Sequence, residues 1–222
     1  MPNKRCQKQF QVLPKTKWSA NQLWELKLRS LLPLCLSLVL FGIGEGFLLL
    51  SNFGSAPWTI LSQGVALQAN ISVGFASFLI SCLVMLSWIP LRLKIGLGTV
   101  LNIVLIAVAL DISTALLTPP DVFVSRLFYA VFGIVLMGIG SAFYLTCHMG
   151  AGPRDGLMVG LCHRFKLHVD VVRTAMESSV VIIGFLLGGT LGLATLLFAF
   201  SIGWVIQATL YLLRRYSLKN KF

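Results

Sequence analysis

Long apolar runs separated by short polar segments form the main pattern of this chain. Six runs are long enough to cross the ~30 Å hydrocarbon core of a bilayer as helices of about 20 residues. They lie near residues 31–50, 72–91, 96–117, 123–147, 169–187 and 191–213. The pattern therefore predicts an all-α polytopic membrane protein with six transmembrane helices.

Two further apolar stretches, residues 56–69 and 152–165, are too short to cross the core. At 1.5 Å per residue, a helix of about 14 residues reaches only about 21 Å. We interpret these stretches as re-entrant half-helices, interfacial helices or thin spans. Charge argues against thin spans, because Arg92 and Lys94 would lie outside the cell if both stretches crossed the membrane.

Each short stretch follows a corner that contains glycine and proline. The corner residues are Gly54 and Pro57 in the first copy and Gly152 and Pro153 in the second. Glycine permits the positive φ at which many helices end, and proline suits the first position of the next helix. The motifs predict tight helix–turn–helix corners. A functional alternative is that the free N–H groups at the start of each new helix bind an anion.

An internal repeat appears when the chain is aligned with itself at an offset of 96 residues. Residues 40–64 then match residues 136–160, with glycine and proline in one register, and 18 of the 72 pairs between 40–111 and 136–207 are identical. Each copy holds three full spans and one short helix. Because three is odd, the copies must have opposite orientations. The sequence predicts an inverted 3+3 repeat, an architecture that many secondary transporters use.

Composition and charge narrow the class of protein. Hydrophobic residues make up 57% of the 222 residues and charged residues 11%, against about 25% charged in soluble domains. This excludes a soluble enzyme, a disulfide scaffold and a disordered tail. The net charge is +11, but the basic residues flank the predicted spans, which disfavours a nucleic-acid partner. Only Arg126 falls near the predicted outer face, so the positive-inside rule predicts that both termini are cytoplasmic.

Four regions follow from these boundaries. Residues 1–30 form a basic cytoplasmic tail, 31–118 the first membrane repeat, 119–213 the second, and 214–222 a second basic tail. Within the first tail, Ser19 and Gln22 fit a capping box that predicts a short interfacial helix over 19–30. A frayed tail is the alternative for residues 1–17.

Charged residues at or inside the predicted spans are the candidates for a substrate or ion pathway. They are Glu45, Asp111, Arg154, Asp155, Arg173 and Glu177. Glu45 has no local partner, so it is either a proton or cation site or a neutral hydrogen-bonding group between helices. Arg173 and Glu177 share one helix face and form either a structural salt bridge or a gate.

The remaining candidates have similar alternatives. Asp111 is either part of the pathway or an interhelical hydrogen-bonding group. Arg154 adds positive charge to the second corner, where Asp155 balances it or caps the helix. We expect Glu45 to lie deeper than Arg154, Asp155, Arg173 and Glu177, which fall near the cytoplasmic mouth. Asp111 falls toward the outer half of its span. If the first and fourth spans cross fully, the corner helices start at opposite membrane faces and do not meet at the midplane.

Catalytic and metal-binding motifs are missing from the sequence. The three histidines share no metal spacing, the five cysteines show no C-x-x-C pattern, and there is no phosphate loop, dinucleotide fingerprint or nucleophile elbow. We expect no enzyme activity, no cofactor and no metal site.

Five stretches resemble one known family. They are Ala56-Pro57-Trp58, residues 150–158, Val172-Arg173-Thr174 with Glu177, residues 184–189, and Ile202-Gly203 with Gln207. Together they resemble the YczE/YitT-like family of bacterial integral membrane proteins, over about residues 33–213. The resemblance implies a multi-pass protein of the bacterial plasma membrane, without an established biochemical activity and with transport as the suspected role.

Taken together, these patterns predict a small-molecule transporter or permease of unknown substrate. The alternative is a non-transporting membrane scaffold or accessory subunit, for which Trp18, Trp24 and the basic N-terminal tail offer a partner surface. The expected partners are the lipid bilayer and a small solute, and the sequence leaves a homodimer open.

Overall fold

The computed structural model of this chain describes residue 14 and residues 16–219, and within them it contains helices, turns and loops but no strand. The helices are α2 (Leu28–Leu50), α3 (Pro57–Ala69), α4 (Val73–Leu86), α5 (Trp88–Leu91), α6 (Leu97–Leu116), α7 (Phe123–Thr146), α8 (Pro153–Phe165), α9 (Val169–Leu186) and α10 (Leu193–Lys219). This agrees with the predicted all-α class, and the two short stretches are indeed separate helices.

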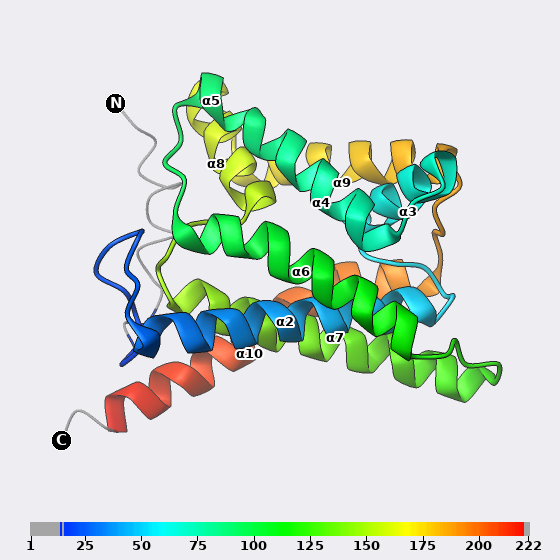
Figure 1. Cartoon of the computed structure of the whole chain (residues 1–222), viewed down its shortest axis with the longest axis horizontal. Helices are drawn as coiled ribbons and strands as arrows, with labels where there is room; N and C mark the ends of the chain where they lie inside the picture. Colours follow the sequence, from blue (N-terminus) through cyan, green and yellow to red (C-terminus); the bar gives the residue numbers. More distant parts are fainter. Residues whose placement is uncertain (1–13, 15, 220–222) are drawn as a thin grey trace.

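The helices form two layers, as Figure 1 shows. One layer holds α2, α7 and α10, with α2 packed on α7 and α7 on α10. The other holds α3, α4, α8 and α9, and α3 packs on α9. Helix α6 contacts both α2 and α4 and so joins the layers. The short helices α3 and α8 lie toward opposite ends of the second layer (Figure 1).

Glycine allows the close contact between α2 and α7. A Cβ atom added to Gly44 would lie 2.8 Å from the carbonyl oxygen of Gly133, and one added to Gly140 would lie 2.7 Å from that of Ser37. Small residues permit such backbone contact in lipid, where burying apolar surface does not drive association. The glycines of these two spans therefore serve helix packing.

Within the described part of the chain, five helical segments are long and apolar enough to cross a membrane. They are Leu28–Leu50, Val73–Leu91, Leu97–Leu116, Phe123–Thr146 and Leu193–Tyr216. The predicted span 169–187 is also helical, but its 18-residue helix α9 carries Asp170, Arg173 and Glu177 and falls outside this set. The structure thus supports a polytopic membrane protein with five strongly apolar helices and a sixth, more polar one.

The N-terminal segment differs from its prediction. Residues 19–27 contain turns and bends, and the first helix among the described residues begins at Leu28. Backbone bonds to distant segments replace the helical ones: Ala20 N–H donates to the Cys147 carbonyl, and Leu97 N–H donates to the Leu23 carbonyl. The predicted interfacial helix over 19–30 is therefore wrong before Leu28. Most of residues 1–17 lie outside the described residues.

The C-terminal tail also differs from its prediction, because α10 continues to Lys219 through the predicted boundary at 213.

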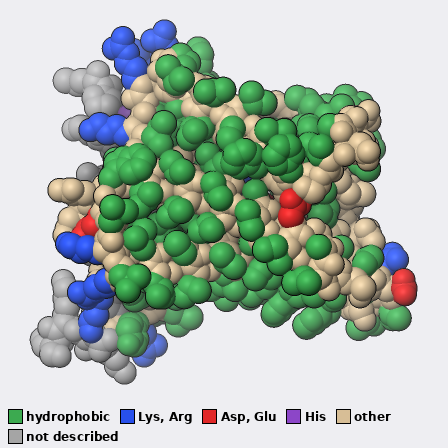
Figure 2. Space-filling view, viewed as in Figure 1, with side chains coloured by type: hydrophobic (Ala, Val, Ile, Leu, Met, Phe, Trp, Pro, Cys, Tyr) green, Lys and Arg blue, Asp and Glu red, His purple; other side chains and the backbone are tan. Residues whose placement is uncertain are grey.

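Figure 2 shows an apolar surface between the two ends of the molecule, with most of the visible Lys and Arg side chains at one end. We call this the basic end. Figure 1 places α5 and the turn between α8 and α9 there. Their exposed basic residues are Arg92, Lys94, Arg164 and Lys166.

Contacts in one half of the molecule recur in the other half 96 positions away. Gly98 N–H donates to the Met149 carbonyl at 2.9 Å, and Ala194 N–H donates to the Phe53 carbonyl at 2.8 Å. Both bonds join equivalent positions once the copies are exchanged. Several other features recur at this offset, including the positive-φ residues Asn52 with His148, Asn70 with Lys166, and Gly54 with Gly150. The repeat is therefore present in local conformation as well as in sequence.

Candidate functional site

Both predicted corners form, with one difference in the role of a glycine. Gly54 has a φ of +104°, and Pro57 takes the first position of α3 after the N-cap Ala56. In the second corner Gly150, rather than the predicted Gly152, takes the positive φ, at +121°. Gly152 has a φ of −62° and is the N-cap of α8, ahead of Pro153. Neither helix start has a side-chain cap.

The second corner is held by hydrogen bonds from three different helices. Tyr144 Oη donates to the Gly150 carbonyl at 2.9 Å, and Thr99 Oγ1 donates to the Ala151 carbonyl at 2.7 Å. Trp88 Nε1 donates to the Pro153 carbonyl at 3.1 Å. These bonds fix the direction in which α8 begins, and with it the position of Arg154.

Glu45 is buried in α2 and pairs with a residue from the other half of the chain. Its side chain is fully enclosed, and its Oε1 lies 3.5 Å from Arg154 Nη1. The same oxygen accepts a hydrogen bond from Thr59 Oγ1 at 3.2 Å, while Oε2 has no partner. The sequence predicted an unpaired Glu45, which is wrong because its partner is 109 residues away along the chain.

Arg154 also contacts the start of the other short helix. Its guanidinium carbon lies 5.2 Å from the centre of the Trp58 ring, a cation–π distance. Trp58 and Arg154 occupy equivalent positions in the two copies, and each lies in the first turn of its short helix. The first turns of the two short helices therefore contact each other through these side chains.

Three further predicted residues lie around this pair. Arg173 Nε donates to Glu177 Oε1 at 2.9 Å within α9, as the i, i+4 spacing predicted. The charges of Arg173, Arg154 and Glu177 all act on the Asp155 carboxylate. Asp155 itself is exposed although it follows directly on the partly enclosed Arg154. We call Glu45, Arg154, Asp155, Arg173 and Glu177 the charge cluster.

Asp111 lies outside the charge cluster. Its carboxylate accepts hydrogen bonds from Ser72 Oγ at 2.6 Å and from the Gly74 N–H at 2.7 Å, both at the start of α4. It therefore joins α6 to α4, and the interhelical alternative of the sequence prediction is confirmed. Of the six predicted pathway residues, the structure brings five together and leaves this one apart.

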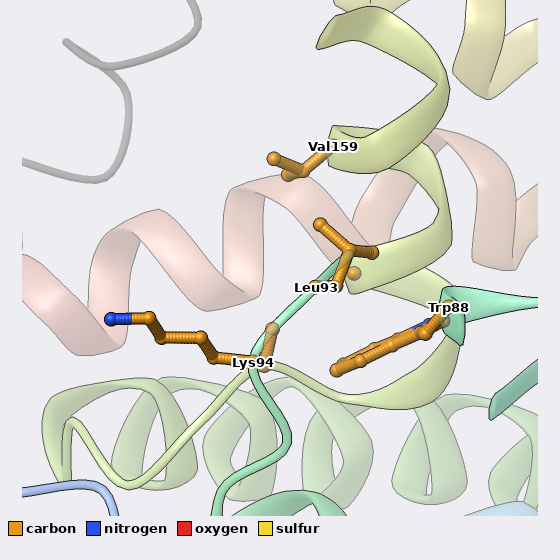
Figure 3. A pocket seen from close by; sticks show the side chains of 6 residues that line it. Trp88, Leu93, Lys94 and Val159 are labelled. Atoms are coloured by element: carbon orange, nitrogen blue, oxygen red, sulfur yellow. The ribbon is translucent and has the colours of Figure 1, made fainter. Parts of the chain in front are cut away.

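A small pocket opens beside the second corner, between α8 and the loop after α5. Its volume is about 180 Å³, and its lining includes Trp88, Leu93, Lys94 and Val159. In Figure 3 the Trp88 ring and Leu93 face this space, while the Lys94 side chain extends away from Trp88. Ala151 and Gly156 also line the pocket, so it lies next to the backbone that carries Arg154 and Asp155.

Comparison with known proteins places the chain in a family. Residues 28–210 match the family described as "Family of unknown function (DUF6198)". The chain belongs to the DUF6198 family. A relative from Haemophilus influenzae is 53% identical over 94% of this chain and 95% of its own length, and its name is "Uncharacterized protein".

Two relatives from Bacillus subtilis extend the family. The uncharacterized membrane protein YczE is 28% identical over 71% of this chain and 74% of its own length. The uncharacterized protein YyaS is 22% identical over 84% of this chain and 95% of its own length. No solved structure shows significant similarity. The predicted resemblance to YczE-like membrane proteins is confirmed, and the DUF6198 match runs from the start of α2 into α10.

Two buried polar side chains near the first corner, Thr59 and Ser55, were not predicted from the sequence. Thr59 is 1% exposed and bonds Glu45, and Ser55 is fully buried with a hydroxyl that has no partner. The repeat offered a signal for the first, because Thr59 is the equivalent of Asp155. Among the described residues, no three His, Cys, Asp or Glu side chains lie close enough together to hold a metal ion.

Proposed function

We propose that this DUF6198 member is a small secondary transporter of the bacterial plasma membrane, with its binding site where α3 and α8 begin. One observation carries the proposal: the enclosed Glu45 carboxylate pairs with Arg154 beside the first turns of the two uncapped short helices, α3 and α8. An ionisable pair inside a membrane is costly to maintain and typically serves a solute or ion pathway. The role is binding and release, and we assign no catalytic step to the cluster.

The proposed architecture is an inverted 3+3 repeat. Support comes from the contacts that recur at an offset of 96 residues and from the opposite directions of α2 and α7 in Figure 1. We assign α9 as the sixth span, with its charged first half facing the cluster rather than lipid. A contact between equivalent positions, such as Trp58 with Arg154, then lies on the axis that relates the copies. Transporters with this architecture bind their substrates at such a place.

The proposed orientation has the basic end and both termini in the cytoplasm. Support comes from the exposed basic residues at one end of the molecule (Figure 2), because cytoplasmic loops carry the excess of Lys and Arg. Asp155 and Arg173 are exposed and Glu177 is half-buried, and α8 and the start of α9 lie toward this end in Figure 1. In this orientation the cluster opens toward the cytoplasm, with Glu45 at its enclosed side.

Two-sided access to the cluster tests this function. The variant Asp155→Cys, in a background without the five native cysteines, is treated with a membrane-impermeant thiosulfonate in right-side-out and in inside-out vesicles. A transporter that alternates between two open states exposes position 155 to the reagent from each side in turn. We expect labelling in both vesicle types, faster from the cytoplasmic side.

Reporter cysteines at exposed positions of the two ends calibrate the sidedness. Ser125→Cys, at the start of α7, is expected to react only from outside, and His168→Cys, before α9, only from inside. Labelling of position 155 from one side alone would contradict transport. That outcome would favour the alternative function of a membrane scaffold or accessory subunit.

A further inference from the structure

Arg154 has hydrogen-bonding capacity that the protein does not use. A guanidinium carries five N–H donors in a planar fork, yet Arg154 makes one contact of 3.5 Å to Glu45 and lies over the Trp58 ring. The first N–H groups of α8 have no side-chain cap. Donors from one side chain and one helix start are therefore gathered at the same place.

The two partners of the ion pair differ in accessibility. The Arg154 side chain is 25% exposed, whereas the Glu45 side chain is 0% exposed. The Arg154 side chain is thus partly accessible from outside the protein, whereas the Glu45 carboxylate is enclosed. The Glu45 oxygen Oε2 is enclosed and accepts no hydrogen bond. A proton can therefore bind this oxygen without displacing a hydrogen-bond donor.

We infer that the cluster binds a small oxyanion of single negative charge, such as a short monocarboxylate, which takes Arg154 from Glu45 while Glu45 takes up a proton. This inference rests on the proposed transport function and names its substrate class and coupling ion. Carboxylates and other planar oxyanions match the guanidinium fork in bidentate geometry. The uncapped start of α8 adds backbone donors to the same anion.

Charge balance favours a single negative charge on the solute. The cluster holds two arginines and three carboxylates and is negative by one charge. An anion that arrives together with one proton leaves that charge unchanged. A dianion would add a further negative charge beside Asp155 and Glu177, so sulfate or succinate is expected to bind poorly.

Proton uptake follows from the burial of Glu45. Once Arg154 turns to the anion, the remaining partner of Glu45 is the uncharged hydroxyl of Thr59. An ionised carboxylate without a counterion is strongly disfavoured in a buried site. The proton comes from the solvent on the side of entry, binds a Glu45 oxygen, and returns to solvent after the anion leaves on the other side.

Among the described residues, no charged group other than Arg154 of α8 forms an ion pair with Glu45. Asp155 interacts electrostatically with that arginine. Asp111 of α6 is turned to α4, and α3 contributes Thr59. The neighbouring α7 packs against this part of α2 through Gly133 and other uncharged residues.

Anion titrations of the purified full-length protein test the inference. The probes are formate, lactate and nitrate as monoanions and sulfate and succinate as dianions, with dissociation constants measured by calorimetry between pH 7 and 8.5. One linked proton makes the dissociation constant of a bound monoanion rise about tenfold per pH unit. In Glu45→Gln, which keeps a group able to bond Thr59, we expect binding that no longer depends on pH.

A matched control is Asp170→Asn, which removes an exposed carboxylate of α9 outside the charge cluster and should keep the tenfold slope. Arg154→Lys should weaken binding at least tenfold, because lysine lacks the planar fork. Overturning results are a pH-independent constant in the wild type, an unchanged slope in Glu45→Gln, or no binding of any monoanion probe. These failures differ from failure of transport, because two-sided labelling of position 155 does not depend on the solute or the proton.

Discussion

The two copies of the repeat differ in how their last two long helices pack, which are α4 and α6 in the first copy and α9 and α10 in the second. In the first copy α4 packs on α6, and Asp111 accepts hydrogen bonds from Ser72 and Gly74. The equivalent positions in the second copy are His168, Asp170 and Gln207, and all three are exposed. There α9 and α10 barely touch. One sequence pattern thus supports a closed arrangement in one copy and an open one in the other.

This difference also has a direction. The closed start of α4 lies away from the basic end, while the open start of α9 lies next to it (Figure 1). The contacts between the two copies are also unequal, since α3 packs on α9 more extensively than α8, its equivalent, packs on α4. Under the proposed function, the structure is an inward-open state. The outward-open state would exchange the two arrangements, with α9 closed on α10 and α4 parted from α6.

The largest expected effect comes from removing the arginine on which the two copies meet. Arg154→Ala leaves Glu45 enclosed without its counterion, and breaking a buried pair in this way costs about 3–5 kcal/mol. We expect a marked fall in the thermal unfolding temperature in detergent. The double variant Arg154→Ala with Glu45→Gln removes the unpaired charge and should recover most of the loss. Equal instability of the single and double variants would show that the ion pair is not the cause.

A smaller effect separates the closed copy from the open one. Gly74 lies against Ala107 and Asp111, so Gly74→Val overpacks the α4–α6 contact and should cost about 1–3 kcal/mol. Gly203 is the equivalent of Ala107 on α10 and has no neighbour within 4 Å. Gly203→Val should therefore leave stability nearly unchanged, as measured by thermal unfolding. Comparable losses in the two variants would mean that α9 and α10 pack together as α4 and α6 do.

Asp111 and its equivalent Gln207 sharpen the same comparison. Asp111→Asn removes the charge that binds the start of α4, and we expect a loss of about 1–2 kcal/mol. Gln207 is exposed, and its side chain makes no hydrogen bond within the described residues. Gln207→Leu should therefore not destabilise the protein. The unfolding temperatures of the two variants check this pair. Destabilisation by Gln207→Leu alone would reverse the assignment of closed and open copies.

The smallest effect is expected at the exposed pair of α9. Arg173 and Glu177 are 58% and 39% exposed, and such i, i+4 pairs contribute about 0.3–0.5 kcal/mol. Arg173→Ala should therefore unfold at almost the wild-type temperature. If the cluster binds an anion, the same variant should still weaken nitrate or lactate binding, because it removes one of two positive charges. Unchanged binding would reduce this pair to a surface contact.

The sequence predicted the helices well because each apolar run and each corner carries a local signal. Pro57 and Pro153 mark the starts of α3 and α8 at the expected positions. Residues 19–27 were wrongly predicted as helical because they carry a helical capping pattern. Backbone hydrogen bonds with Cys147, directly after α7, and with Leu97, the first residue of α6, override this pattern. Local propensity cannot reveal such long-range bonds.

The site was predictable only in part. The residue types of the charge cluster stood out because charges are rare in apolar spans, but the pairing of Glu45 with Arg154 joins the two copies and leaves no trace in local spacing. Thr59 and Ser55 are small polar residues of a kind common in membrane helices, so only the equivalence of Thr59 with Asp155 in the repeat offered a signal, and Ser55 had none. The different closure of the two copies is also invisible in a sequence, since it depends on which of two packings the whole molecule adopts.

Spin-label distances in the reconstituted protein can follow both copies at once. Phe75 and Ile112 are exposed on α4 and α6, and their equivalents Val171 and Ala208 are exposed on α9 and α10. Labelled cysteine pairs at 75 and 112, and at 171 and 208, report the closed and the open contact. We predict two distances for each pair, with the short 171–208 distance populated when the long 75–112 distance is, and a shift between them on addition of a transported anion. One fixed distance for each pair, under every condition from pH 5 to 8.5 with and without the anions, would contradict alternation between the two copies.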